Sequence, residues 1–363
     1  MADVEPDDRA AKLQLLRTPT IGPVTYRHLI ARFGTARAAL EALPMLAARG
    51  GRRDLRPADP RSVRHELAVI DKLGASPLFV NEAAYPALLK ATESAPPMLI
   101  VRGDVGLLTR PTVAIVGARN ASAAACRFAR GLASQLAAEG ATVVSGLARG
   151  IDTAAHVGSV GEATVGVIAS GIDIAYPPEN VELQERIARE GLLIAEQPPG
   201  TEPLARHFPS RNRIIAGLAL GTVVIEAAPK SGSLITARIA AEIGREVMAV
   251  PGSPLDPRAQ GCNLLIRDGA TLIQTAMDVL EQIRPIDARA VAQPHTPYDP
   301  GPAEDASDAD RQRVADLLGH TPVQVDEVVR LAGLPSAVVQ TALLELELGG
   351  RLERHAGSRV SLG

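Results

Sequence analysis

Six short apolar runs decide the fold of this chain: TVAIVG (112–117), ATVVSG (141–146), TVGVIAS (164–170), LLIAE (192–196), TVVIEA (222–227) and EVMAV (246–250). The segments between them have helical spacing, near 121–139, 152–162, 179–190, 210–220 and 232–244. Strands of this length that alternate with helices form right-handed β-α-β units and a parallel sheet covered on both faces. We therefore expect an α/β protein with a Rossmann-like parallel sheet core over residues 112–283.

The segment before this core predicts a different structure. Residues 1–70 contain short helical stretches with Gly22-Pro23 as a boundary, so we expect a helical domain of the SAM or helix-hairpin-helix type. Such a unit is either a DNA-binding module or a small bundle without that role. Residues 71–111 follow as a lead-in extension, and we expect residues 50–110 to be irregular until the apolar strand Met98–Val101.

The segment after the core predicts a linker and a small third module. Residues 284–310 are rich in Pro, Ala and Asp and lack periodicity, which is typical of a flexible linker. Residues 311–363 predict three short helices and a terminal hairpin, the pattern of a winged helix. Its third helix carries Glu345 and Glu347 but no Lys or Arg, so we favour protein contact or regulation over DNA reading. The predicted wing, with Arg351, Arg354 and Arg359, keeps DNA reading open.

Charge is distributed unevenly along the chain. The formal net charge is −3, but residues 1–70 carry 12 Lys/Arg against 8 Asp/Glu, a balance of +4. Residues 71–283 carry 18 against 21, and residues 284–363 carry 8 against 12, a balance of −4. Bulk attraction to nucleic acid is therefore excluded, and any such site has to be a local cluster of cations.

Nothing in the sequence predicts export or a membrane span. No apolar run approaches the ~20 residues that a membrane helix needs, and the acidic N-terminus lacks an apolar signal core. Cys126 and Cys262 have no metal-ligand spacing, and a reducing compartment suits them. We expect a cytoplasmic protein without membrane contact.

Small residues and cations follow four of the predicted strands at the edge where a parallel sheet binds ligands. These segments begin at Gly117, Ser145, Arg206 and Lys230. Glycines allow close approach to the backbone, and helix N-termini favour anions. We expect five cations to converge there and to hold phosphates through bidentate contacts; they are Arg119, Arg149, Arg211, Arg213 and Lys230.

Enzyme motifs are incomplete in this sequence. Arg119 stands where a dinucleotide fingerprint needs its second Gly, and Lys230-Ser231-Gly232-Ser233 lacks the leading Gly of a P-loop, so we expect no cofactor and no ATP hydrolysis. None of the seven histidines has a metal-ligand pattern around it, so we also expect no metal.

Two alternative functions stay open. The first is a nucleotide-hydrolysing enzyme of the phosphoribohydrolase type, in which Asp152 and Glu226 would form a carboxylate pair. Its motif PGGxGTxxE is missing, and we expect Asp152 to cap a helix and Glu226 to anchor an arginine. The second alternative is a transcription regulator that binds duplex DNA through the winged helix.

Taken together, several ordered blocks resemble the DprA/Smf family (DNA processing protein A). They are VGARNAS (116–122), SGLARGIDTAAH (145–156), ASGIDIAYPPEN (169–180), HFPSRNRIIAGLA (207–219), VVIEAAPKSGSLITARIAAEIGREVMAVPG (223–252) and GCNLLIRDGA (261–270). The resemblance covers residues 10–280 well and the C-terminal module loosely. It implies a non-enzymatic homodimer that binds and protects incoming single-stranded DNA and loads the RecA recombinase during natural transformation and recombination.

The resemblance also implies a DNA pocket. Its residues would be Arg119, Ser145, Gly146, Arg149, Gly150, Phe208, Arg211, Asn212 and Arg213, with Lys230, Ser231, Gly232 and Ser233 nearby. The family's usual Ser is replaced by Ala118, which removes one hydroxyl donor. Aromatic residues are only 2% of the chain and Trp is absent, so we expect phosphate contacts to dominate. Phe208 either stacks on one base or plugs its segment into the core.

Overall fold

The computed structural model describes residues 6–52, 54–283, 305–355 and 357–363, which form two compact units. One unit contains the described residues up to His65 together with those from 305 onward, and the other unit begins at Glu66 and ends, in its described part, at residue 283. Most of the predicted linker, residues 284–304, lies outside the described residues. The last residues of that predicted linker are helical, because a helix starts at Asp308 behind a Ser307 cap.

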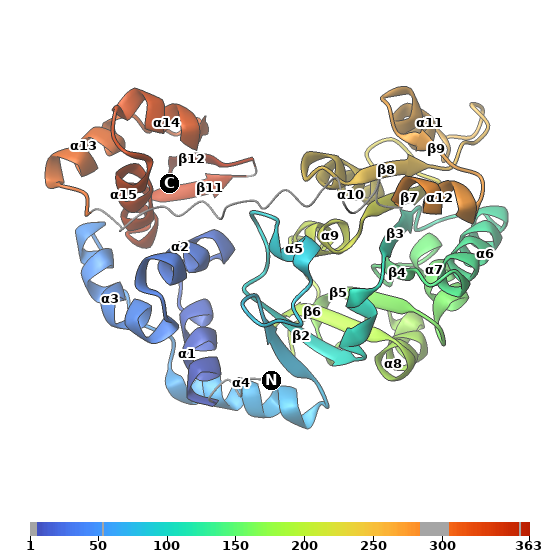
Figure 1. Ribbon diagram of the computed structural model, residues 1–363, viewed down its shortest axis with the longest axis horizontal. Coiled ribbons are helices and arrows are strands. Elements are labelled where there is room, and N and C mark those ends of the chain that lie inside the picture. Colours follow the sequence, from blue (N-terminus) through green and yellow to red (C-terminus); the bar gives the residue numbers. More distant parts are fainter. Residues whose placement is uncertain (1–5, 53, 284–304, 356) are drawn as a thin grey trace, which may run out of the picture. The chain divides into compact units, whose positions relative to one another are not determined.

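The larger unit is an α/β domain whose elements alternate (Figure 1). Its strands are β1 (Ser76–Phe79), β2 (Met98–Gly103), β3 (Thr112–Gly117), β4 (Thr142–Ser145), β5 (Thr164–Gly171), β6 (Leu192–Gln197), β7 (Gly221–Ile225), β8 (Glu246–Ala249) and β9 (Thr271–Leu272). Its helices are α5 (Ala87–Lys90), η1 (Val105–Thr109), α6 (Ala123–Ala138), α7 (Ile151–Ser159), η2 (Pro178–Asn180), α8 (Val181–Glu190), α9 (His207–Leu218), α10 (Gly232–Glu242), α11 (Gln260–Arg267) and α12 (Ala276–Ile283). Helix α4 (Pro60–Lys72) precedes them.

One nine-stranded sheet organises this unit, in the order β1-β2-β6-β5-β4-β3-β7-β8-β9. The strands from β6 to β9 in that order pair in parallel, whereas β2 pairs antiparallel with β6 and β1 with β2. The chain runs outward from β3 to β6 and then returns to the other side of β3 as β7. The predicted α/β class and parallel core are confirmed.

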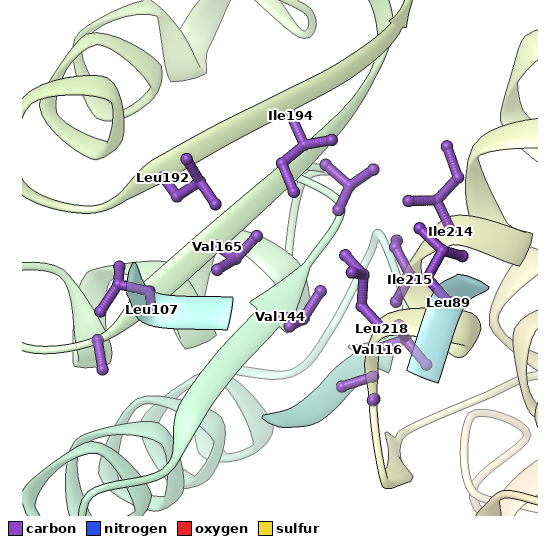
Figure 2. Close-up of a cluster of buried hydrophobic side chains, with 14 of the residues drawn as sticks. Leu89, Leu107, Val116, Val144, Val165, Leu192, Ile194, Ile214, Ile215 and Leu218 are labelled. Atoms are coloured by element: carbon purple, nitrogen blue, oxygen red, sulfur yellow. The ribbon is translucent and has the colours of Figure 1, made fainter. Parts of the chain in front are cut away.

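Two apolar clusters cover the two faces of the sheet. In β3, Ala114 and Val116 face the cluster that contains Ile214 and Leu218 of α9, while Val113 faces the opposite cluster, which is formed with α6, α7 and α12. Figure 2 shows α9 and Leu89 of α5 packed over the first face. Successive strand residues point to opposite faces, so runs without polar interruption give a sheet that is buried on both sides.

The connection over residues 50–110 is more regular than expected. It contains α4, β1, α5, β2 and η1, and β1 and β2 extend the sheet by two antiparallel strands. Sequence reasoning missed β1 because it is only four residues long and begins with Ser76-Pro77, which lacks an apolar signal. It also missed α11, β9 and α12 after residue 250.

The smaller unit joins the two ends of the chain. Its helical part consists of α1 (Pro6–Arg17), α2 (Pro23–Phe33) and α3 (Ala36–Arg49), and α2 begins at the predicted Gly22-Pro23 boundary. Its winged helix, also as predicted, consists of α13 (Asp308–Asp316), β10 (Val323–Gln324), α14 (Val325–Ala332), α15 (Ser336–Leu348), β11 (Leu352–His355) and β12 (Arg359–Leu362). The three strands pair in the order β10-β12-β11.

We searched the described residues for helices that could span a membrane and for clusters of side chains that could hold a metal ion. No single described helix is both long and apolar enough to span a bilayer, although the bent pair α14 and α15 satisfies both conditions by length and composition. No group of three or more described His, Cys, Asp or Glu side chains is arranged to hold a metal ion.

Candidate functional site

The site lies where the direction of the sheet topology reverses. Strand β3 has β4 on one side and β7 on the other, and the connections that follow β3 and β7 lead away in opposite senses. Crevices outside the carboxyl ends of parallel strands form at such a point. The loop after β3 and the first turns of α7, α9 and α10 surround this crevice.

Two adjoining cavities, of about 380 and 620 Å³, occupy the crevice. Both are lined by Arg119, Asn120, Ala148, Phe208 and Arg211. We call the two cavities together the strand-end cleft. The smaller cavity extends toward the loop after β5, and the larger cavity extends toward the start of α10.

Aromatic side chains form one wall of the cleft. The Arg119 guanidinium carbon lies 5.3 Å from the centroid of the Phe208 ring, which is cation–π distance. The Tyr176 ring meets Phe208 edge to face, with centroids 5.8 Å apart, and Tyr176 is 45% exposed. Phe208 therefore lines the cleft and supports a cation, which excludes a role confined to the core.

Arg211 forms the buried floor of the cleft. Arg211 is only 6% exposed, and its Nη1 donates a hydrogen bond to the Val167 carbonyl oxygen at 2.9 Å. Burial lowers the pKa of Arg211 to about 10, against the attraction of Asp152, while Arg119 lowers the pKa further. Even so, the guanidinium stays charged at neutral pH.

Gly146 and Asp152 complete this buried floor. Asp152 accepts backbone hydrogen bonds from Gly146 at 3.2 Å and Ala148 at 3.3 Å. Burial raises the pKa of Asp152, and the charge of Arg211 opposes that rise. A Cβ at Gly146 would collide with the Arg211 guanidinium, so only glycine allows this side chain to lie against the end of β4.

The N-terminus of α10 faces the larger cavity. Ser231, Gly232 and Ser233 all line it, and Asn212 of α9 lines it opposite them. The Ser231 and Ser233 hydroxyls are 2.8 Å apart, and Ser231 caps α10 without a side-chain hydrogen bond to the helix backbone. The partial positive charge at the start of an eleven-residue helix therefore points toward this cavity.

Two other predicted residues shape the cleft from behind its wall. Ser145 is fully buried, and its hydroxyl donates to the Ile115 carbonyl oxygen at 2.6 Å. Gly150 has a φ of 76°, and a Cβ there would collide with the backbone of Ala118 and Arg119. Neither residue is among the described lining of the two cavities, so they hold the loops that carry Arg119 and Gly146 in place.

Arg149 stands at the rim of the smaller cavity. Its side chain is 62% exposed and forms a 2.5 Å ion pair with Glu179, whose side chain is 59% exposed. An exposed pair of this kind contributes little to stability and exchanges readily with solvent. Arg149 can therefore turn toward an anion in the cleft at little cost.

Arg213 and Lys230 do not join the other three cations. Residues 207–213 are the start of α9, which begins three residues before the helix expected near 210–220, and residues two apart on a helix point to nearly opposite sides. Arg213 consequently bonds Glu196 and the Ser94 carbonyl oxygen instead of lining the cleft beside Arg211. Lys230 adopts a φ of 68° in the turn before α10 and is not among the described residues that line either cavity.

The expected roles of the two carboxylates also change. Asp152 lies inside the first turn of α7, whose cap is Gly150, so it does not cap that helix. Glu226 accepts from the Ser122 backbone at 2.8 Å and its hydroxyl at 2.7 Å, so its hydrogen bonds come from the start of α6 and not from an arginine of the cleft. Asp152 and Glu226 line different cavities and do not form the suspected carboxylate pair.

Sequence reasoning missed several residues that line the cleft, among them Tyr176, Asn120 and the cation Arg258. Tyr176 and Asn120 line it, although both stand in sequence blocks that carry the family resemblance. Tyr176 lies 32 residues before Phe208, and only the fold brings the two rings together. The available signal was a tyrosine beside Pro177-Pro178 after a predicted strand, in a chain with few aromatic residues.

Sequence relatives of this chain are known. It is 45% identical over 209 residues to DNA processing protein DprA of Streptococcus pneumoniae, over 56% of this chain and 72% of that protein. It is 36% identical over 313 residues to protein Smf of Escherichia coli, over 83% of this chain and 81% of that protein.

Solved structures of similar proteins agree in fold. DprA from S. pneumoniae matches with a TM-score of 0.59 and 40% identity, over 62% of this chain and 79% of that one. DNA processing protein A from Helicobacter pylori matches with a TM-score of 0.53 and 29% identity, over 57% of this chain and 94% of that one.

Family patterns match all three parts of the chain. A DprA-like N-terminal HHH domain matches residues 6–69, and a DprA winged helix domain matches residues 298–358. The pattern of DNA recombination-mediator protein A matches residues 76–284, the segment that contains the whole strand-end cleft. With this agreement in sequence and fold, the chain belongs to the DNA recombination-mediator protein A family.

Proposed function

We propose that the strand-end cleft binds single-stranded DNA. The observation that carries this proposal is the Arg119 guanidinium resting on the Phe208 ring within an open cavity. A cation on an aromatic face presents a phosphate donor and a stacking surface together, which suits a nucleotide. The H. pylori relative is described as binding single-stranded DNA.

The shape of the cleft favours a single strand over a duplex. Its walls are loops and helix N-termini, whereas duplex reading uses a helix or a ribbon that projects into a groove. The Tyr176 and Phe208 rings offer room for one base, while Arg119, Arg149 and the start of α10 bind the backbone. With so few aromatic side chains, affinity depends mainly on phosphates and falls steeply with salt.

The proposed task of the bound strand is recombination. We propose that the protein protects incoming single strands in the cytoplasm as a homodimer and hands them to the RecA recombinase, without catalysing a reaction itself. Membership of a recombination-mediator family supports this role. An enzymatic role for Asp152 is disfavoured by the buried floor of the cleft, where this carboxyl accepts hydrogen bonds from backbone N–H groups and has a structural role beside Arg211.

A salt titration of oligo-dT binding tests the proposal. Arg119→Ala is expected to weaken binding about tenfold or more and to reduce the salt slope by about 0.7, the value for one lost phosphate contact on a single strand. Fluorescence anisotropy of a labelled oligonucleotide over a series of salt concentrations measures both quantities.

The matched control is Arg189→Ala. Arg189 is an exposed arginine of the same unit, on the last turn of α8, just before β6 begins, and so at the opposite edge of the sheet. The control should bind like the wild type. Equal losses in the two variants would show that the cleft is not the binding site, and release of a free base from nucleoside monophosphates would favour the enzyme.

A further inference from the structure

Helix α15 of the winged helix is largely buried, with Ser336 at its start exposed. Its residues Val339, Ala342, Leu343 and Leu346 lie in the core of the winged helix itself. A second stripe, Val338, Thr341, Glu345 and Leu348, is equally buried but lies outside that core. These residues recur at helical spacing of three and four, so they form one face, and α15 packs there against α3 of the N-terminal helical part (Figure 1).

The contact between α3 and α15 is closest at two glycines. A Cβ on Gly50, just after α3, would overlap the Glu345 carbonyl oxygen, and a Cβ on Gly349 would overlap the Gly50 carbonyl oxygen. Both glycines have helical backbone angles, with φ of −73° and −72°, so glycine is not required there for its conformation. It is required for the close approach of the two backbones.

Two glutamates of α15 bind partners on both sides of this contact, in the N-terminal part and in the winged helix. Glu347 accepts from the Thr25 hydroxyl of α2 at 2.7 Å and from Arg354 Nε of β11 at 2.9 Å. Glu345, whose side chain is 2% exposed, bonds Arg311 Nε at 2.6 Å and lies 3.7 Å from Arg49 Nη1. Both carboxylates that made the third helix acidic are therefore neutralised inside the fold.

Two arginines of the N-terminal part, Arg32 and Arg49, are bound in the same cluster. Arg49 forms a 2.9 Å ion pair with Asp305, and Arg32 reaches Asp305 at 3.2 Å and the Thr341 hydroxyl at 3.1 Å. Burial works to raise the pKa of Asp305, but the hydrogen bonds from Arg49 and Arg32 outweigh it and hold the pKa below its ordinary value. Two cations of the basic N-terminal part thus meet carboxylates of the acidic C-terminal part.

We propose that the N-terminal helical part and the winged helix mask each other: α15 is closed to duplex DNA, and Arg32 and Arg49 are closed to phosphates. In winged helices the third helix is the element that enters the major groove. Here that helix is covered, and Arg354 of the wing is bound to Glu347. The two terminal modules act as one body held by its own charges, which leaves strand binding to other parts of the chain. This inference does not depend on the function proposed for the strand-end cleft.

Substitutions at the two glycines test the masking in the full chain. Gly50→Ala and Gly349→Ala add volume only where the two backbones meet. Matched controls are Gly22→Ala and Gly319→Ala, one in each module, where a Cβ meets nothing within 4 Å. Hydrogen–deuterium exchange of the α2–α3 and α15 peptides measures opening, and anisotropy with a short labelled duplex at low salt measures unmasked cations.

We expect both test variants to speed exchange of the α2–α3 and α15 peptides together by about tenfold or more and to raise duplex affinity by a similar factor. Both controls should match the wild type. Faster exchange without a gain in duplex affinity would overturn the masking, as would test variants that behave like the controls. If the alanine variants fail to fold, Asp305→Asn, which adds no volume and removes the carboxylate that pairs with Arg32 and Arg49, is expected to give the same two changes, and its failure to do so would overturn the proposal.

Discussion

The strand-end cleft and the contact between α3 and α15 both contain arginines, a residue type that binds phosphates well. At the α3–α15 contact, Arg32 and Arg49 lie within 3.2 Å of the Asp305 carboxylate. In the cleft, Arg119 lies against an aromatic ring, and no carboxylate of the described residues forms an ion pair with it. An arginine is open to a ligand where the fold brings no carboxylate to its guanidinium group, and it stabilises the fold where a carboxylate pairs with it.

The comparison extends to charges that are fully buried. Arg211 in the cleft and Glu345 in α15 both have neighbouring opposite charges, and both are nearly inaccessible. Burying a charge is costly, and the opposite charge offsets that cost only while it is present. We therefore expect each to act first on stability, although only Arg211 borders an open cavity.

The largest expected effect distinguishes the two arginines of the cleft. Arg211→Ala removes the positive charge beside the buried Asp152 and should lower the free energy of unfolding by about 3–5 kcal/mol. Arg119→Ala should change stability little, because its side chain faces a cavity. Urea unfolding of both variants measures the difference. Equal stabilities would mean that Arg211 is not a structural charge, and the double variant with Asp152→Ala should recover part of the loss.

The aromatic wall comes next in size. Tyr176→Ala should weaken oligo-dT binding by about 1–3 kcal/mol, the usual value for one stacked base, without changing the salt slope. Tyr176→Phe keeps the ring and should bind like the wild type. If Tyr176→Ala instead reduced the salt slope and left the affinity at high salt unchanged, Tyr176 would serve to position Arg119, and the base would bind elsewhere.

Acid should destabilise both units through one histidine in each, the fully buried His156 and the half-buried His28. Burial and the nearby charges of Arg354 and Arg27 lower the pKa of His28 to about 4. Burial and the nearby charge of Arg211 lower the pKa of His156 to about 3. The unfolded chain takes up these protons near pH 6.5 while the folded chain does not, so stability falls as the pH drops below that value. Between pH 7.5 and 5.5 the loss should be about 1 kcal/mol for each histidine.

Urea unfolding at the two pH values measures this loss. His28→Gln should remove its share of the pH dependence, whereas His65→Gln, at an exposed position on α4, should leave the dependence unchanged. An equal slope in all three proteins would show that buried histidines do not control acid sensitivity.

The smallest expected effect concerns the rim of the cleft. Glu179→Gln releases Arg149 from its exposed ion pair and should tighten oligo-dT binding by less than about threefold, and only at low salt. Glu185→Gln, which releases Arg102 from another partly exposed pair on α8, should leave binding unchanged. A gain in both variants would reflect net charge and not the rim of the cleft.

The strands were predictable because parallel strands buried on both faces appear as continuous apolar runs. Segments that follow those runs share one edge of the sheet, so the sequence alone was enough to place Arg119, Gly146 and Ser231 together. Arg213 was misplaced because we treated Arg211 and Arg213 as parts of one strand-end segment, although both fall in the helix expected near 210–220, where residues two apart point to nearly opposite sides. Tyr176 was missed because the path of a proline-rich loop has no periodic signal.

The sequence by itself determined the alternation of strands and helices, the edge of the sheet at which the cleft forms, and the opposite charge balance of the two ends of the chain. These are properties of local pattern and composition, which any stretch of residues carries with it. Only the tertiary structure decided which cations remain open to a ligand and which are bound by carboxylates some 256 to 296 positions away, such as Asp305 and Glu345 on Arg49. Coulomb attraction acts through space and is strong only at short range, so a count of charges along the chain does not reveal it.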